Sequence, residues 1–92
     1  MKAAPDTRPR TLRLRDAVAA ELATWDRATE RRADAEYALE QFEEAGLNLS
    51  PEQLEHQREQ MHEAIREARR EEEEARKIWR KAMDRAEREI PR

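Results

Sequence analysis

The 92-residue sequence has no cysteine, a single glycine and only four aromatic residues, two of them tryptophans. The absence of cysteine excludes disulfides, thiolate metal sites and a cysteine nucleophile, and it fits a reducing compartment. One glycine excludes the glycine-rich loops that bind phosphates. No apolar run exceeds the four residues 17–20, so we expect no membrane-spanning segment and no cleaved signal peptide. We therefore predict a cytoplasmic protein without a membrane partner.

Few residues are available for catalysis or metal binding. Ser50 is the only serine, and His56 and His62 are the only histidines. Glu59 and His62 have the Glu-x-x-His spacing of di-iron four-helix proteins, but glutamate is so abundant here that this spacing is expected by chance. A pair of helices also forms no deep pocket. We predict that the protein is not an enzyme, binds no metal or cofactor, and has no small-molecule substrate.

Charged side chains make up 45% of the residues and are unevenly distributed along the chain. Residues 1–15 carry five basic and one acidic side chain, and residues 75–92 carry seven and three. Residues 40–74 instead carry four basic and twelve acidic side chains. If the chain folds back on itself near its middle, both basic segments meet at one end of the molecule and the other end is acidic.

Residues 42–46 predict the end of a helix. Gly46 is the one residue of the chain that can adopt a positive φ without strain, as the residue after a helix C-terminus often does. With Gly46 in that position, Phe42 and Leu47 are the apolar residues that pack together in a Schellman motif.

A second helix is expected to begin shortly after this glycine. Ser50 is a favourable N-cap, Pro51 suits the first helical position, and Gln53 can complete a capping box. So short a connection between two helices leaves room only for a tight reversal. We therefore predict an all-α fold, a two-helix antiparallel coiled-coil hairpin.

The boundaries of the predicted elements follow from these signals. Thr11 is the expected N-cap of the first helix, because the residues before it include two prolines, and a start near Pro9 is the alternative. The predicted organisation is a disordered basic N-terminal tail over 1–10 and a helical hairpin over 11–90, with a helix at 11–45, a turn at 46–50 and a helix at 51–90.

Both predicted helices carry a stripe of residues at alternating steps of four and three, the heptad spacing of coiled coils. We call this stripe the seam. In the first helix it comprises Leu14, Val18, Glu21, Trp25, Ala28, Arg32, Ala35, Leu39 and Phe42. In the second helix it comprises Leu54, Arg58, Met61, Ile65, Ala68, Glu72, Ala75, Trp79, Ala82 and Ala86. The four charged members either extend into solvent or penalise incorrect alignment of the two helices.

The two seams can be aligned to within about one helical turn. An alignment that places large side chains opposite small ones fills the space between the helices without voids. In that alignment Trp25 faces Ala75, and Trp79 faces Glu21.

Near the open end, by which we mean the end of the hairpin opposite the turn, the apolar stripe is wider than the seam. One partner helix cannot cover both sides of such a stripe, and an exposed apolar patch usually marks a binding surface. We predict a protein interface formed by Leu22, Trp25, Ile78, Trp79, Met83 and Ile90. Through it, the protein is expected to form a homodimer with a four-helix bundle, or to dock on a larger protein as an adaptor, chaperone or assembly factor.

The alternative function is nucleic-acid binding by a helical rod whose open end is rich in arginine. A cluster of basic side chains can contact phosphates and give salt-dependent binding. The residues predicted for this role are Arg8, Arg10, Arg13, Arg15, Lys77, Arg80, Lys81, Arg85 and Arg88.

Overall fold

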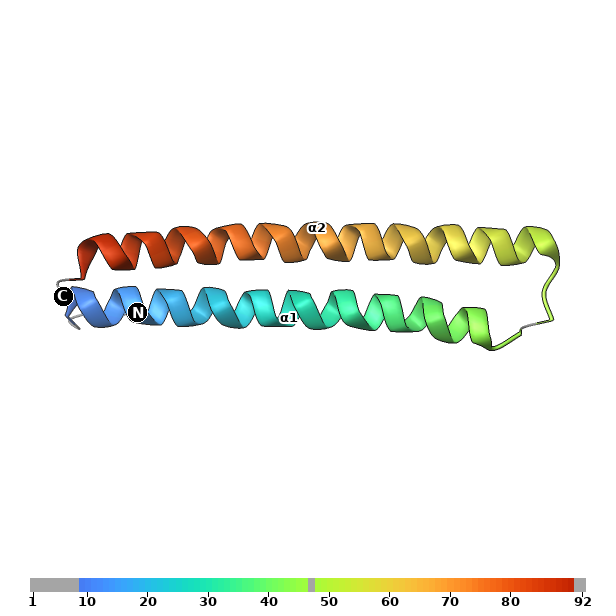
Figure 1. Cartoon of the computed structure of the whole chain (residues 1–92), viewed down its shortest axis with the longest axis horizontal. Helices are drawn as coiled ribbons and strands as arrows, with labels where there is room; N and C mark the ends of the chain where they lie inside the picture. The colour runs from blue at the N-terminus through green and yellow to red at the C-terminus, as the bar shows by residue number, and fades with distance from the viewer. Residues whose placement is uncertain (1–8, 47, 91–92) are drawn as a thin grey trace, which may run out of the picture.

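Two long helices, joined by a short turn, pack against each other along their length (Figure 1). The computed structural model describes residues 9–46 and 48–90. Helix α1 spans Arg10–Glu44 and helix α2 spans Pro51–Glu89, and the described residues contain no strand. The predicted all-α antiparallel hairpin is therefore confirmed. The start of α1 and the end of α2 lie together at the open end (Figure 1).

Helix α1 begins at the earlier of the two expected positions. Its N-cap is Pro9, whose carbonyl accepts a hydrogen bond from the Arg13 N–H at 3.1 Å. The proline has a φ of −53° and a ψ of 144°, so it leads into the helix without providing a capping side chain. Thr11 is consequently a residue of the first turn and not the cap. The predicted N-terminal tail falls mostly on residues 1–8, which lie outside the described residues.

The end of α1 follows the predicted glycine signal. The Ala45 N–H donates to the Gln41 carbonyl at 3.0 Å, and Gly46 has a φ of +57°. This left-handed conformation turns the chain away from the helix axis, as expected for the residue after a helix C-terminus. Leu47 lies outside the described residues, so its predicted contact with Phe42 is not described.

The capping box at the start of α2 is present as predicted. The Gln53 N–H donates to Ser50 Oγ at 3.2 Å, and the Ser50 N–H donates to Gln53 Oε1 at 3.0 Å. Pro51 occupies the first helical position, where its missing N–H has no intrahelical partner to lose. Gly46 after the end of α1 and Ser50 as the N-cap of α2 thus produce the reversal between the two helices.

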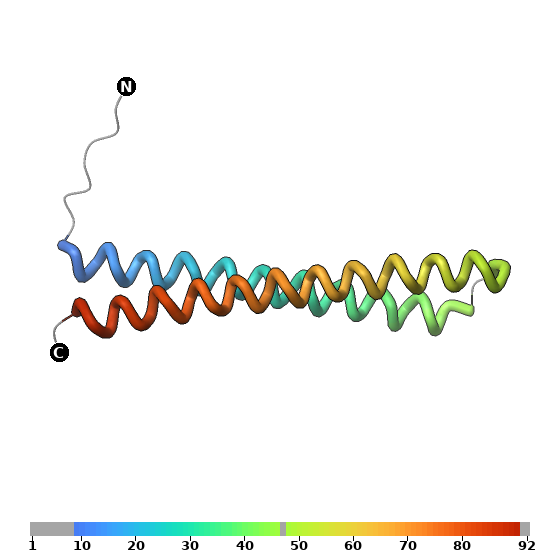
Figure 2. The backbone as a smooth tube through the Cα atoms, turned by 90° about the horizontal axis from the view of Figure 1, so that it is seen from above, coloured from blue at the N-terminus to red at the C-terminus, as the bar shows by residue number. Residues whose placement is uncertain are grey.

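The core of this hairpin is thin. Its buried residues all belong to the predicted seam, and most of them are alanines: Leu14, Ala28, Ile65, Ala68, Ala75 and Ala86. The two helices cross near the middle of the rod, as expected for a supercoiled pair (Figure 2). Because each helix has a single neighbour, even the largest side chains of the seam remain partly accessible.

The conformation of Gly46 leads to a first prediction. A Cβ atom at this position would meet no other atom within 4 Å, so Gly46→Ala is expected to destabilise the hairpin only through its positive φ. The expected loss is about 1 kcal/mol in the free energy of unfolding, measured by urea denaturation. Gly46→Asn is the control and should lose less, because asparagine adopts this conformation more readily than alanine. Equal stability of the alanine variant and the wild type would contradict this account.

Candidate functional site

Two tryptophans contact each other across the helices in the open half. The rings of Trp25 on α1 and Trp79 on α2 are 5.1 Å apart between centroids and inclined by 38°. The Arg80 guanidinium lies 5.9 Å from the Trp79 ring centroid, within the range of a cation–π contact. The expected alignment places Trp25 opposite Ala75 and Trp79 opposite Glu21. The observed alignment differs from it by about one helical turn, the margin within which the two seams could be aligned. Aromatic contacts of this kind stabilise by about 0.5–1.5 kcal/mol beyond the area they bury, which favours the observed alignment.

The indole N–H of Trp79 is buried and has no hydrogen-bond partner among the described residues. Removing such a donor from water without a partner costs about 1–3 kcal/mol. The packing of the two rings must offset this cost, so the stability of this part of the hairpin depends on close contact between the two aromatic side chains.

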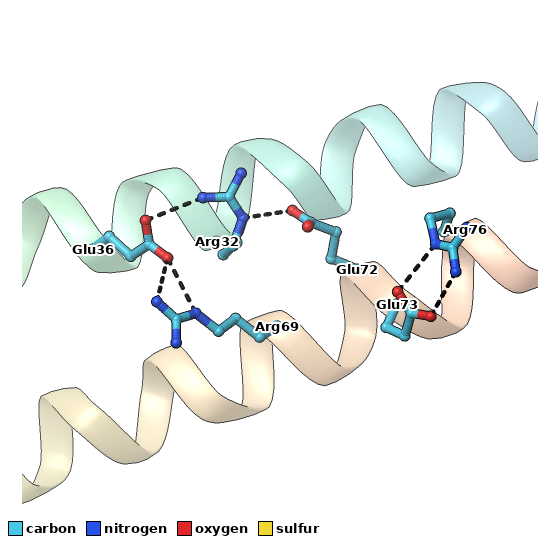
Figure 3. A network of polar contacts seen from close by, with 6 residues as sticks. All are labelled: Arg32, Glu36, Arg69, Glu72, Glu73 and Arg76. Atoms are coloured by element: carbon cyan, nitrogen blue, oxygen red, sulfur yellow. Dashed lines mark hydrogen bonds and ion pairs between the residues drawn. The ribbon is translucent and has the colours of Figure 1, made fainter.

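An ion-pair cluster crosses the middle of the hairpin. It consists of Arg32 and Glu36 on α1 and of Arg69 and Glu72 on α2 (Figure 3). Arg32 Nε donates to Glu72 Oε2 at 2.6 Å and Arg32 Nη1 to Glu36 Oε2 at 3.1 Å, while Arg69 Nη2 donates to Glu36 Oε1 at 3.0 Å. The two charged seam residues of this cluster, Arg32 and Glu72, therefore face each other across the helices.

The cluster shifts the pKa values of Glu36 and Arg32 in the direction that keeps them charged. Hydrogen bonding from Arg69, supported by the charge of Arg32, lowers the pKa of Glu36 below its ordinary value of 4.5. Hydrogen bonding to Glu72 raises the pKa of Arg32. A neighbouring pair within α2 behaves similarly, because Arg76 lowers the pKa of Glu73 (Figure 3).

The ion-pair cluster and the tryptophan contact belong to one alignment of the helices. Trp25 lies one heptad before Arg32, and Trp79 lies one heptad after Glu72. In an antiparallel coiled coil, a pair of facing residues predicts further facing pairs at each heptad in opposite directions along the two helices. The pairing of Arg32 with Glu72 therefore places Trp25 opposite Trp79.

The same rule places three apolar residues from outside the seam on one side of it. Glu36 pairs with Arg69 on this side, and two heptads towards the open end Leu22 comes opposite Met83. Ile90 follows Met83 by one heptad. We call these three residues, Leu22, Met83 and Ile90, the apolar flank. Leu22 is 39% exposed, and Met83 and Ile90 are half-buried.

Ile78 lies on the other side of the seam. Arg31 Nε and Glu71 Oε2 are 3.6 Å apart on that side, and one heptad further Thr24 comes opposite Ile78. Ile78 is 49% exposed and borders a shallow hollow of about 290 Å³ that also includes Thr24, Ala28 and Ala75. Four of the six predicted interface residues thus lie on two opposite flanks of the hairpin, and Trp25 and Trp79 lie between these flanks.

The basic side chains of the open end are close together but partly neutralised. Arg10 Nη2 and Arg85 Nε lie 2.9 and 3.3 Å from the same carboxylate oxygen of Glu89, and Arg10 is the main cause of the lowered pKa of Glu89. Lys77 Nζ is 3.6 Å from Glu74, and Arg88 Nε donates to a main-chain carbonyl. Arg13, Arg15 and Lys81 are exposed, whereas Arg8 lies outside the described residues.

Glu59 and His62, whose spacing resembles a metal motif, are both exposed near the turn. Across residues 9–46 and 48–90 no group of three or more histidine or carboxylate side chains is arranged to hold a metal ion. Neither α1 nor α2 contains a stretch that is long and apolar enough to cross a membrane.

Comparisons with protein-family models, with curated proteins and with solved structures find no match.

Acid should weaken the ion-pair cluster. The lowered pKa of Glu36 means that its pairing stabilises the fold above about pH 4.5, and that this contribution is lost as the pH falls through the folded-state pKa. We expect the melting temperature, followed by circular dichroism, to fall between about pH 6 and pH 3. Glu36→Gln should melt lower than wild type at neutral pH and show a smaller fall in acid.

The control for this measurement is Glu40→Gln, which removes an exposed carboxylate one helical turn closer to the turn of the hairpin. It should keep the wild-type melting temperature and its full dependence on pH. If both variants respond to acid as the wild type does, Glu36 does not contribute to the acid sensitivity.

Proposed function

We propose that this protein is a non-enzymatic protein–protein interaction module that associates with a second copy of itself through the apolar flank. The observation that supports this proposal is the alignment of Leu22, Met83 and Ile90 beyond the ion-pair cluster. On this side of the seam, charged pairs give way to partly exposed apolar side chains towards the open end. A second hairpin packed there would complete a four-helix bundle over the open half of the rod.

The thin core of the hairpin favours association with a second copy. Fully burying a leucine or methionine side chain stabilises by about 1.5–3 kcal/mol relative to full exposure. Leu22 and Met83 realise only part of this stabilisation in one hairpin, and a symmetric dimer would bury both residues from each copy. Trp25 and Trp79 lie directly beneath the flank and would give the interface a rigid aromatic base.

A module of this kind acts by bringing proteins together. As a homodimer it would serve as a small adaptor, chaperone or assembly factor, because a rod with charged faces and one apolar flank offers a defined docking surface. A larger protein that presents an amphipathic helix could occupy the same flank in place of the second copy.

Charges introduced on the apolar flank should dissociate the dimer. For the double variant Leu22→Glu and Met83→Glu we expect a loss of self-association of at least about tenfold, since burying an unpaired carboxylate is strongly unfavourable. Both positions lie beside the seam, so the helical circular dichroism of the variant should be retained. Sedimentation equilibrium over a concentration series measures the effect. A double variant that dimerises as tightly as wild type would contradict the proposal.

Two further variants locate the interface. Tyr37 is 61% exposed and lies closer to the turn, outside the apolar flank, so Tyr37→Glu should leave self-association unchanged. Ile78→Glu tests the opposite flank and should have a small effect. If Ile78→Glu dissociates the dimer and the double variant does not, the interface lies on the side of the hollow.

Salt separates this proposal from nucleic-acid binding. Association driven by apolar burial should persist at high ionic strength, whereas binding to phosphates weakens steeply as salt rises. A protein that stays monomeric at all concentrations and binds DNA only at low salt would favour the arginine-rich open end as the functional surface.

A further inference from the structure

We infer that the two copies in the proposed dimer are antiparallel, with the two-fold axis crossing the rods at the level of Leu22 and Met83. This inference rests on the proposed self-association and concerns the orientation of the second copy. It is drawn from the distribution of charge along the hairpin and from the position of the apolar flank near one end.

Two symmetric arrangements bring the apolar flanks of two hairpins face to face. In the parallel arrangement the axis runs along the rods, α1 faces α2 of the second copy, and the two turns lie side by side. In the antiparallel arrangement the axis is perpendicular to the rods, each helix faces its own copy, and the two turns point in opposite directions. Both arrangements bury Leu22 and Met83, so apolar contact alone does not choose between them.

Charge pairs close to the flank do not choose either. Asp26 and Arg80 border the flank on α1 and α2, so the parallel arrangement brings Asp26 near Arg80 of the second copy. The antiparallel arrangement instead brings Glu87 near Arg80 of the second copy. Each arrangement therefore gains a comparable surface pair, and such pairs contribute little.

The acidic turns decide the orientation. The segment 40–59 contains a single basic residue, Arg58, and six glutamates: Glu40, Glu43, Glu44, Glu52, Glu55 and Glu59. The parallel arrangement places two such segments side by side, about one or two helix diameters apart, and no apolar residue of the flank holds them together. In the antiparallel arrangement they are separated by roughly 60 Å, several times the screening length of about 8–10 Å at physiological salt.

The basic open ends support the same orientation. In the parallel arrangement the two basic open ends lie side by side. In the antiparallel arrangement Arg15 lies within about one helical turn of Asp26 of the second copy, because both are near the level of the two-fold axis on helices that face each other. Like charges are separated and unlike charges approach, which favours this geometry.

Spin labels can measure the orientation directly, because the chain has no cysteine of its own. Glu44→Cys places one label at the end of α1, and Ala23→Cys places one close to the proposed axis; both residues are exposed. For the antiparallel dimer we expect a distance of roughly 65 Å between the two labels at 44 and about 30 Å or less between those at 23, measured by double electron–electron resonance. Sedimentation of both labelled variants establishes that they are dimers.

The possible outcomes distinguish this inference from the proposed function. A distance of about 30 Å at both positions would identify a parallel dimer, which overturns the orientation and leaves self-association in place. A monomer in both variants and in the unlabelled wild type would overturn the proposed function and the orientation together. A long distance at 44 with a short distance at 23 supports both.

Discussion

Two helices that pack only against each other share one line of contact, and their alignment along that line determines which side chains meet. In this hairpin the alignment is marked by the contact between Arg32 and Glu72 at 2.6 Å. A charged pair at a seam stabilises less than an apolar pair of the same size, but sliding the helices would leave each charge opposite an alanine or an aromatic ring. Glu36 and Arg69 reinforce the pair from one side of the seam. The cluster therefore contributes mainly to the specificity of the alignment.

The arrangement of the open half follows from that alignment. Trp25 meets Trp79 one heptad away from the charged pair. The same register places Leu22 opposite Met83 on the flank beside them. A shift of one helical turn would separate the tryptophans and distribute the apolar residues among charged neighbours. Packing of the core, exposure of the flank and the proposed self-association thus all depend on a single interhelical register.

The fold could be predicted from the sequence because its signals are local. Gly46 and Ser50 define the turn through backbone conformation and capping, which depend on a few neighbouring residues. The heptad spacing likewise identifies the seam within each helix. The register between the helices is a nonlocal property, and the sequence predicted it only to within about one helical turn, which is the difference between the expected and the observed alignment. Pairing the charged seam residues Arg32 and Glu72 with each other would have placed Trp25 opposite Trp79.

The sequence could predict which residues form the candidate site, but it could not predict which of them lie on the same side of the hairpin. Leu22 and Ile78 both stand outside the seam, which heptad spacing reveals within each helix. That they lie on opposite sides of the hairpin becomes clear only when ion pairs between the helices, such as Glu36 with Arg69 and Arg31 with Glu71, show which positions face each other. The start of α1 was predicted only as one of two positions, Thr11 or Pro9, because a proline with an extended ψ can precede a helix without any capping side chain.

The location of both indole rings in a single layer has a consequence for how unfolding is observed. Each layer of the rod contacts only the layers next to it, so the molecule can open from one end while the remainder stays helical. Indole emission would then register melting of that layer alone, whereas far-ultraviolet ellipticity averages over the entire length. Transition midpoints that differ between these two signals would reveal unzipping of the rod, and coincident midpoints would indicate that the paired helices melt as one cooperative unit.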